Sequence, residues 1–240
     1  MIKILICGAN GRMGKEAVNA IHEDPALELI GVCLRGDNLS DKINLHRPDV
    51  VLDLTTPDTV YQNCETIIAH NVRPVIGTTG LTAQQIEHLQ QLCLQKQLGG
   101  IIAPNFSLSV MLMIKMAALA AQYFPQAEII ELHHDKKKDS PSGTAIKTAQ
   151  VIAQNRVHPD INVPYPNEPA RGSIVEQTPI HSVRLPGLIA HQQIIFGGYY
   201  ESLEIKQDNF DRKSFMPGVL MACKKVLELK HLVYGLENLL

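Results

Sequence analysis

The residues with the clearest chemical potential lie in segment 131–144, Glu-Leu-His-His-Asp-Lys-Lys-Lys-Asp-Ser-Pro-Ser-Gly-Thr. His133 and His134 can take up and release protons near neutral pH, and three lysines follow them closely. The backbone N–H groups of 142–144 and the Thr144 hydroxyl fit a carboxylate at the start of a helix. These groups suit proton transfer on a small substrate with two carboxylates, although a run of basic residues by itself is also typical of a solvated loop.

No metal site is predicted, because the histidine pair lacks a third ligand at a suitable spacing. His158, His181 and His191 are scattered along the chain, whereas zinc ligands usually come in short, regular spacings. The cysteines never form a C-x-x-C pair and are odd in number; they are Cys7, Cys33, Cys64, Cys93 and Cys223. We expect reduced core thiols in a cytoplasmic protein.

A glycine-rich loop at 8–14, Gly-Ala-Asn-Gly-Arg-Met-Gly, follows an apolar run directly. Glycines allow a tight turn and close approach of a pyrophosphate to the backbone, and the following helix adds its partial positive charge. The second glycine is displaced by one position from the usual G-x-G-x-x-G spacing, so a plain turn is the alternative. We expect a dinucleotide site formed by Gly8, Ala9, Asn10, Gly11, Arg12 and Met13.

The end of the second expected strand carries Arg35, followed by Gly36 and Asp37. An acidic residue there would bind the ribose diol of NAD, whereas a guanidinium suits a 2′-phosphate. We therefore expect both NADPH and NADH to be used, with NADPH preferred. The alternative for Arg35 is a solvated surface side chain.

Two further loops follow expected strands, where ligands of parallel sheets bind. Their small and polar residues could hold a nicotinamide carboxamide, although turn formation alone would also explain them. The expected cofactor contacts are Gly77, Thr78 and Thr79 in one loop, and Ala103, Pro104, Asn105 and Phe106 in the other.

Alternating strands and helices must position these loops. Residues 1–105 show expected strands at 2–7, 27–34, 50–54, 74–76 and 101–102, and helices at 15–23, 59–70 and 82–97. This alternation predicts a Rossmann-like, doubly wound parallel sheet. Beyond it, helices are expected at 109–123, 144–155 and 215–228, an irregular loop at 159–169, and strands at 128–133, 174–177, 182–184, 192–196 and 202–207. These predict an α+β domain with a mixed or antiparallel sheet.

The overall composition agrees with two domains of an α/β class. The chain has 240 residues, 45% of them hydrophobic, with a net charge of −2, which excludes disorder and gives no sign of nucleic-acid binding. No apolar run reaches the length of a spanning helix, and the N-terminus lacks the features of a signal peptide. We expect a dinucleotide-binding domain at 1–106, completed by 213–240, and a substrate-binding and oligomerisation domain at 107–212.

The motifs, in this order, resemble those of the 4-hydroxy-tetrahydrodipicolinate reductase (dihydrodipicolinate reductase) family. The resemblance rests on G-A-N-G-R-M-G at 8–14, D-x-T-x-P at 53–57, G-T-T-G at 77–80, A-P-N-F-S at 103–107 and the histidine–lysine segment extended to Ala145. It implies NAD(P)H-dependent reduction of a dehydrated cyclic dicarboxylate to tetrahydrodipicolinate, in lysine biosynthesis through diaminopimelate. It further implies a cytoplasmic homotetramer joined through the sheets of the second domain.

The resemblance also implies residue roles. His133 would be the catalytic acid/base and Lys137 the proton donor, with His134, Gly143 and Thr144 binding substrate. The late R-x-x-F-x-x-G pattern places Arg212 where it could reach the cofactor.

Three positions depart from the family pattern: Ser109 replaces a usual Gly, Ala190 replaces a Gly, and Gln207 replaces a frequent His. Two rival interpretations fit the sequence less well. A semialdehyde dehydrogenase would need a cysteine nucleophile in a polar loop, and a non-catalytic dinucleotide sensor would have no use for the segment at 131–144.

Overall fold

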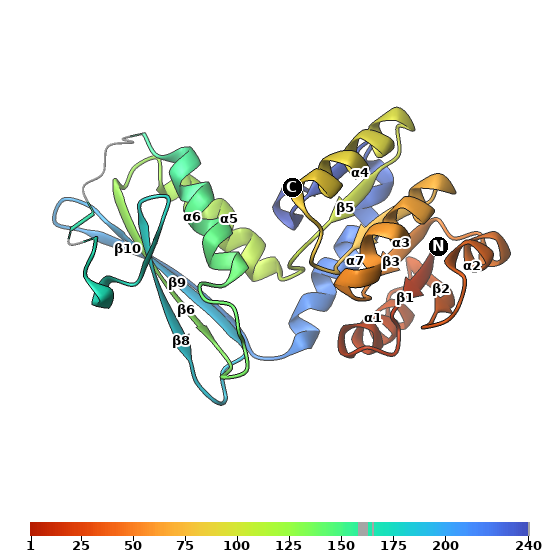
Figure 1. Ribbon diagram of the computed structural model, residues 1–240, viewed down its shortest axis with the longest axis horizontal. Coiled ribbons are helices and arrows are strands. Elements are labelled where there is room, and N and C mark those ends of the chain that lie inside the picture. The colour runs from red at the N-terminus through yellow and green to blue at the C-terminus, as the bar shows by residue number, and fades with distance from the viewer. Residues whose placement is uncertain (158–162, 165, 240) are drawn as a thin grey trace. The chain divides into compact units, whose positions relative to one another are not determined.

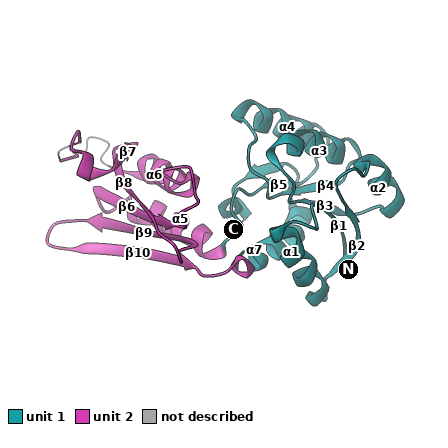
Figure 2. Cartoon of the chain, turned by 60° about the horizontal axis from the view of Figure 1, so that its bottom comes forward, with its two compact units in different colours: residues 1–107, 215–240 teal, residues 108–214 magenta. Residues whose placement is uncertain are grey.

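The structure is a computed structural model that describes residues 1–157, 163–164 and 166–239. The chain divides into two compact units, which are coloured separately in Figure 2. Unit 1 comprises residues 1–107 and 215–240, and unit 2 comprises residues 108–214. Much of the expected irregular loop at 159–169 lies outside the described residues. None of the described helices is both long and apolar enough to cross a membrane.

Unit 1 is built on a six-stranded parallel sheet with the strand order β11-β5-β4-β3-β1-β2 (Figure 1). The strands are β1 (Ile2–Cys7), β2 (Leu27–Cys33), β3 (Val50–Asp53), β4 (Arg73–Ile76), β5 (Gly100–Ile102) and β11 (Leu232–Tyr234). The helices are α1 (Arg12–Glu23), α2 (Leu39–His46), α3 (Pro57–Ala69), α4 (Ala83–Gln95) and α7 (Met216–Lys225). The central strands are apolar and buried because helices cover a parallel sheet. The predicted doubly wound α/β fold is confirmed.

The sequence does not predict helix α2 and strand β11 of unit 1. Helix α2 is short and largely polar, and the Asn38 side chain caps it by accepting from the Asp41 N–H. Strand β11 is only three residues long and extends the sheet beside β5. Helix α1 also begins at Arg12, three residues earlier than expected, whereas the Thr82–Gln85 capping box that opens α4 is present as the sequence indicates.

Unit 2 contains a five-stranded mixed sheet with the order β10-β9-β6-β8-β7. Its strands are β6 (Gln126–His133), β7 (Ser173–Val175), β8 (Thr178–Arg184), β9 (Ala190–Gly197) and β10 (Ser202–Asn209), and its helices are α5 (Leu108–Ala120) and α6 (Gly143–Asn155). Strands β6 and β8 are parallel, and the other pairs are antiparallel. The prediction of an α+β domain with a mixed or antiparallel sheet is confirmed, and the sheet is of the mixed kind.

The turn between β7 and β8 differs from the expected strand at 174–177. Glu176 and Gln177 have φ values of 47° and 59°, a left-handed conformation that ends the strand and starts the hairpin return. Strand β8 therefore begins at Thr178, four residues before the expected start.

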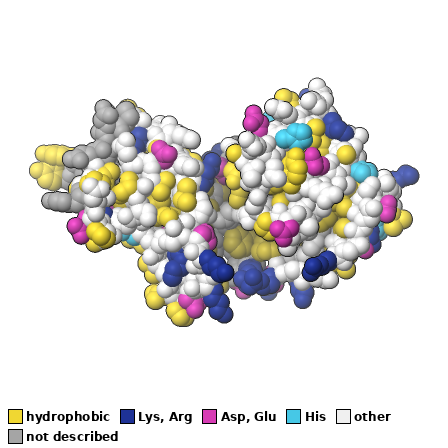
Figure 3. All heavy atoms as spheres, viewed as in Figure 1, with side chains coloured by type: hydrophobic (Ala, Val, Ile, Leu, Met, Phe, Trp, Pro, Cys, Tyr) yellow, Lys and Arg dark blue, Asp and Glu magenta, His cyan; other side chains and the backbone are white. Residues whose placement is uncertain are grey.

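The two faces of the second sheet differ in their covering. Ile129, Ile194 and Phe196 are buried in one core with residues of α5 and α6. The opposite face carries Ile130 and Ile195, which are half-buried. Hydrophobic side chains also reach the surface on the face of unit 2 drawn in Figure 3. Strands of alternating pattern thus bury one face and leave apolar area on the other.

Candidate active site

The glycine-rich loop of unit 1 joins the end of β1 to the start of α1. Gly8 has φ +83°, and a Cβ there would stand 2.4 Å from the Leu54 carbonyl oxygen. A Cβ on Gly14 would stand 2.2 Å from the Gly8 carbonyl oxygen, so any side chain would push this loop apart. No side chain caps α1 at Gly11, and its first turn holds no acidic residue. This helix start is therefore suited to the negative charge of a pyrophosphate.

A cavity of about 960 Å³ lies beside this loop, entirely within unit 1. Of the predicted cofactor residues, Gly8, Gly11 and Arg35 line it, together with Thr55 and Asn63. Its volume can accommodate a nucleotide. Ala9, Asn10, Arg12 and Met13 lie in the same loop or in the first turn of α1.

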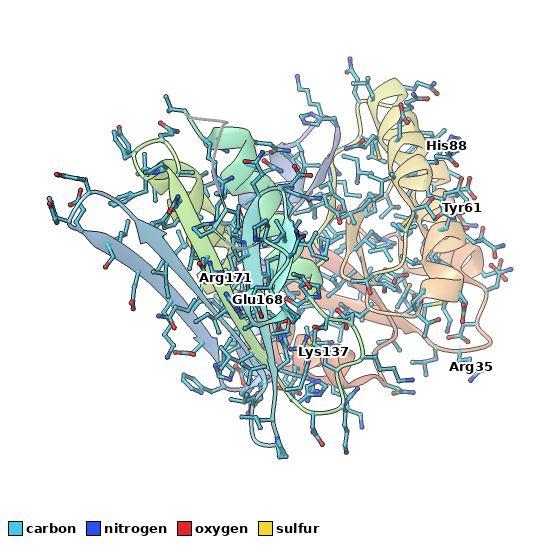
Figure 4. The ribbon with its side chains drawn as sticks, turned by 60° about the vertical axis from the view of Figure 1, so that its left-hand side comes forward. Arg35, Tyr61, His88, Lys137, Glu168 and Arg171 are labelled. Carbon is cyan, nitrogen blue, oxygen red and sulfur yellow. The ribbon has the colours of Figure 1, made fainter. Side chains whose placement is uncertain are left out.

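Arg35 is exposed in the turn after β2, where Figure 4 shows it at the edge of unit 1. The turn is closed by Asp37, whose carboxylate accepts from the Leu34 N–H at 2.9 Å and lies 3.4 Å from the Lys42 ammonium. The hydrogen bond from Leu34 lowers the pKa of Asp37. The acidic neighbour of Arg35 is thus engaged by its own turn and by Lys42.

The two predicted nicotinamide loops follow β4 and β5 and contact each other. A Cβ on Gly77 would meet the Phe106 ring at 2.5 Å, so the loops pack closely. Thr78 is buried and donates its hydroxyl hydrogen bond to Asp53 at 2.6 Å, whereas Thr79 is exposed. The Thr78 hydroxyl hydrogen is therefore used inside the protein, and the contact of Thr78 and Thr79 with the cofactor stays a prediction.

The side-chain amide of Asn105 holds the second of these loops. Asn105 Oδ1 accepts from the Ser107 N–H at 2.8 Å. Ala103 and Phe106 are buried and Pro104 is exposed. The side chain of Asn105 therefore shapes the loop.

In unit 2, His133 forms part of a network around a fully buried carboxylate, Glu131. His133 Nδ1 lies 2.5 Å from Glu131 Oε2, and the Arg184 guanidinium donates to both carboxylate oxygens, at 2.8 and 2.7 Å. Burial alone would raise the pKa of Glu131, but the hydrogen bonds from His133 and Arg184 lower the pKa to about 2. An ionised carboxylate accepts the Nδ1 hydrogen, which leaves Nε2 of His133 as the atom that can exchange a proton.

Sequence reasoning missed the roles of Glu131 and Arg184. Glu131 and His133 are two residues apart on the expected strand, so their side chains share one face, and this spacing was a usable signal for Glu131. Arg184 is 53 residues away in sequence, and it reaches Glu131 only because β8 lies beside β6.

The start of α6 is tied to the same carboxylate. The Ser142 N–H donates to Glu131 Oε1 at 3.1 Å, and the Ser142 hydroxyl caps the helix by accepting from the Ala145 N–H. The expectation of three exposed N–H groups at 142–144 is therefore wrong for Ser142. Gly143 and Thr144 occupy the first turn of α6, at the positive end of the helix dipole.

Lys137, labelled in Figure 4, forms an ion pair within its own loop. Its ammonium lies 2.8 and 2.7 Å from the two oxygens of Asp139, and it lowers the pKa of that carboxyl group. The Lys137 N–H donates to the His134 carbonyl, which closes the turn after β6. The structure thus places Lys137 in the turn that follows His133 and His134, with an acidic partner of its own.

Two of the three departures from the family pattern contact each other. Ser109, at the start of α5, donates its hydroxyl hydrogen bond to the buried Gln207 side chain of β10 at 3.2 Å. Ala190 begins β9. Arg212 is exposed in a 3₁₀ turn, Arg212–Phe215, that precedes α7.

Comparisons with known proteins cover the whole described site. Residues 2–106 match the family model "Dihydrodipicolinate reductase, N-terminus", and residues 109–240 match "Dihydrodipicolinate reductase, C-terminus".

The chain is 52% identical over 239 residues to 4-hydroxy-tetrahydrodipicolinate reductase of Coxiella burnetii (strain RSA 493 / Nine Mile phase I), covering 100% of this chain and 99% of the relative. It is 48% identical over 240 residues to the enzyme of the same name from Legionella pneumophila (strain Lens), covering 99% of both chains.

A solved structure, a dipicolinate-bound dihydrodipicolinate reductase from Paenisporosarcina sp. TG-14, matches with a TM-score of 0.90 and 45% identity over 100% of both chains. A scyllo-inositol dehydrogenase from Lactobacillus casei is similar in fold alone, with a TM-score of 0.66, 15% identity, and coverage of 100% of this chain and 92% of that one. The family matches span both units and the relatives align over nearly their full length, so the chain belongs to the dihydrodipicolinate reductase family.

Proposed function

We propose that His133 and Lys137 handle the proton in this chain's reductase reaction, and that Gly143 and Thr144 hold a carboxylate of its substrate. The chain is an NAD(P)H-dependent oxidoreductase of its family, and the reaction reduces a dehydrated cyclic dicarboxylate to tetrahydrodipicolinate, a step of lysine biosynthesis through diaminopimelate.

The observation that carries the residue roles is the shared carboxylate of Glu131. One oxygen accepts from the His133 ring, and the other accepts from the backbone at the start of α6. Glu131 therefore connects the proton-transferring ring to the helix end that favours an anion. A substrate whose carboxylate is bound at that helix end would be fixed near the His133 ring, and such positioning supplies much of an enzyme's rate.

Each side chain has a distinct part in this proposal. Glu131 orients the His133 ring and stabilises the imidazolium that forms, while Arg184 keeps the buried carboxylate compensated. Lys137 contributes a second proton-donating group on release from Asp139. His134 lies beside the turn that carries Lys137, where a positively charged side chain would attract the second carboxylate of the substrate.

The cofactor fits the residues of unit 1. The close backbone approach at Gly8, the uncapped start of α1 and the cavity beside Arg35 favour a dinucleotide with its pyrophosphate on the loop. When bound, the reduced nicotinamide supplies the hydride. The predicted loop contacts at 77–79 and 103–106 belong to this proposal, with the exposed Thr79 as the hydroxyl directed outward.

The two rival functions find less support. A semialdehyde dehydrogenase needs an accessible cysteine nucleophile, but all five cysteines are buried, and burial raises the pKa of Cys93 and Cys223 to about 12. A dinucleotide sensor would not need a buried carboxylate that connects a histidine to an anion-binding helix start.

The setting of the enzyme is also part of the proposal. Five free thiols favour the reducing cytoplasm. The half-buried Ile130 and Ile195, on the face of the second sheet opposite α5 and α6, favour an association of identical subunits through that sheet, and the family resemblance implies four of them.

A coupled assay tests the proposal. Freshly generated 4-hydroxy-tetrahydrodipicolinate is added to the protein with NADPH, and the loss of nicotinamide absorbance is followed. We expect turnover in the wild type and a loss of roughly two to four orders of magnitude in kcat for His133→Ala, with cofactor affinity unchanged. Near-normal turnover in His133→Ala would contradict the proton-transfer role assigned to His133.

A further inference from the structure

A polar cluster of unit 1 surrounds the buried Asp53, the last residue of β3. Its side chain is fully buried. In the sheet register Asp53 lies between Cys7 of β1 and Ile76 of β4. These are the last residues before the glycine-rich loop and before the loop that starts at Gly77. The carboxylate thus lies at the carboxyl edge of the sheet, between two predicted cofactor loops.

The Asp53 carboxylate accepts four hydrogen bonds from the described residues. Oδ1 accepts from the Thr55 N–H at 3.1 Å, from the Thr55 hydroxyl at 2.7 Å and from the Thr78 hydroxyl at 2.6 Å. Oδ2 accepts from the Asn63 side-chain amide at 2.8 Å. Among the described residues no Lys, Arg or His forms an ion pair with Asp53, so neutral donors alone compensate its burial.

These donors come from three segments that would otherwise be separate. Thr55 belongs to the loop after β3, Thr78 to the loop after β4, and Asn63 to α3. Backbone hydrogen bonds also join β3 to its two neighbouring strands at this edge. The Leu54 N–H donates to the Cys7 carbonyl at 3.0 Å, and the Gly77 N–H donates to the Asp53 carbonyl at 2.9 Å. The Leu54 carbonyl is also the atom that a Cβ on Gly8 would strike.

We propose that Asp53 is a positioning residue for the cofactor. Through Thr78, Thr55 and Asn63 its carboxylate fastens the loop after β4 to the loop after β3, whose Leu54 backbone lies against Gly8 of the glycine-rich loop. This role rests on the assignment of the loop after β4 and the glycine-rich loop to the cofactor. Thr78 therefore acts through its hydroxyl on Asp53, and it is the backbone of the loop that is presented to the ligand. Preformed loops bind with a smaller ordering cost.

An exchange of the Asp53 and Asn63 side chains tests this role. Asp53→Ala takes the acceptor away from the buried Thr78 hydroxyl and from the half-buried Thr55 and Asn63. Asn63→Asp places two carboxylates together, so each variant should raise the Kd for NADPH by about tenfold or more. The double variant Asp53→Asn/Asn63→Asp restores a donor facing a carboxylate and keeps an acceptor for Thr78. We expect its Kd to return to within about threefold of wild type.

The binding is measured by the fluorescence of NADPH on the full chain, beside thermal unfolding. Thr148→Val is the matched control, because Thr148 is a buried threonine of unit 2 that hydrogen-bonds to Gln192. It should lower the unfolding temperature and leave the NADPH Kd unchanged. Turnover at saturating NADPH should fall far less than affinity in Asp53→Ala, since the proton-transferring residues lie in unit 2.

Three results would overturn the role of Asp53: wild-type NADPH affinity in Asn63→Asp, a double variant as weak as that single variant, or an equal loss of affinity in Thr148→Val. Should Asp53→Ala fail to fold, the comparison of Asn63→Asp with the double variant still decides. Binding of NADPH does not require turnover, so a failure of the proposed reaction would be seen separately in the coupled assay.

Discussion

Glu131 Oε2 lies 2.5 Å from His133 Nδ1, and the same carboxylate accepts hydrogen bonds from both terminal nitrogens of the Arg184 guanidinium. The pKa of Glu131 is lowered from 4.5 to about 2. A carboxyl group with a lowered pKa stabilises the folded chain above its unfolded-state pKa, and this contribution is lost as the pH falls through the folded-state value. Glu131 should therefore contribute roughly 3 kcal/mol at neutral pH, decreasing below about pH 4.5.

Urea unfolding of wild type and Glu131→Gln checks this relationship. The difference in free energy of unfolding should be large near neutral pH and should shrink at about pH 3, because the wild-type carboxylate is losing its advantage there. Glu168→Gln serves as the control, since Glu168 is an exposed glutamate of the same unit. A difference that stays constant with pH would contradict an ionised Glu131 in the native state.

Lys137 should affect turnover and leave cofactor binding intact. Lys137→Ala removes the second proton-donating group, and we expect kcat to fall by roughly two to four orders of magnitude. Asp139→Asn removes the partner of the ammonium and keeps the lysine, so its effect on kcat should be below about tenfold. The measurements are steady-state kcat and the NADPH Kd of each variant. Equal losses of kcat in both variants would show that the ion pair, and not the lysine itself, is required.

Thr144 should act on substrate affinity. If its hydroxyl binds a carboxylate equally in the ground and transition states, Thr144→Val raises KM for the dicarboxylate by about tenfold with little change in kcat. Thr144→Ser, which keeps the hydroxyl, should stay close to wild type. An unchanged KM in Thr144→Val would move the carboxylate site elsewhere, towards His134 and Lys137.

Arg35 should set the choice between NADPH and NADH. A charge-assisted hydrogen bond to a 2′-phosphate gives about 1.5–3 kcal/mol, or one to two orders of magnitude in affinity, and exposure of Arg35 shifts this towards the lower end. We expect a preference for NADPH that shrinks as salt rises, and a reversal towards NADH in Arg35→Glu. The measurement is kcat/KM for each cofactor at two ionic strengths.

Arg47→Glu is the control for that charge reversal, because Arg47 is an exposed arginine of unit 1 that does not line the cavity. It should leave the cofactor ratio unchanged. A wild-type preference for NADH at low salt would contradict the role given to Arg35.

Ser109 and Gln207 should be energetically coupled. Ser109→Gly and Gln207→His each remove one side of a hydrogen bond at a buried side chain, and each should cost about 1 kcal/mol of unfolding free energy. Their combination brings back the residues that are usual in the family, so the double variant should cost less than the sum by more than about 0.5 kcal/mol. Additive losses would mean that the two departures arose independently of each other.

The sequence predicted most of the fold because short buried apolar runs alternate with amphipathic helices. It missed α2, whose polar sequence has little apolar periodicity, and β11, which is too short to be distinguished from a loop. The contacts within the site were harder to predict from the sequence than the fold. Arg184 and Asp53 act through contacts across neighbouring strands and loops, and such pairings depend on sheet order, which spacing along the chain does not reveal. The engagement of Thr78 and Ser142 by buried carboxylates could not be foreseen for the same reason.

Strand β11 pairs with β5 through Val233 and Ile101, although more than a hundred residues separate them. The order of synthesis on the ribosome follows the chain, so residues 1–107 emerge long before their last strand and helix α7. Until then β5 is an open sheet edge, which is prone to pairing with other chains. Unit 1 can thus be completed only after β11 (Leu232–Tyr234) has been synthesised, and a fragment ending near residue 107 would be an aggregation-prone intermediate, not a domain.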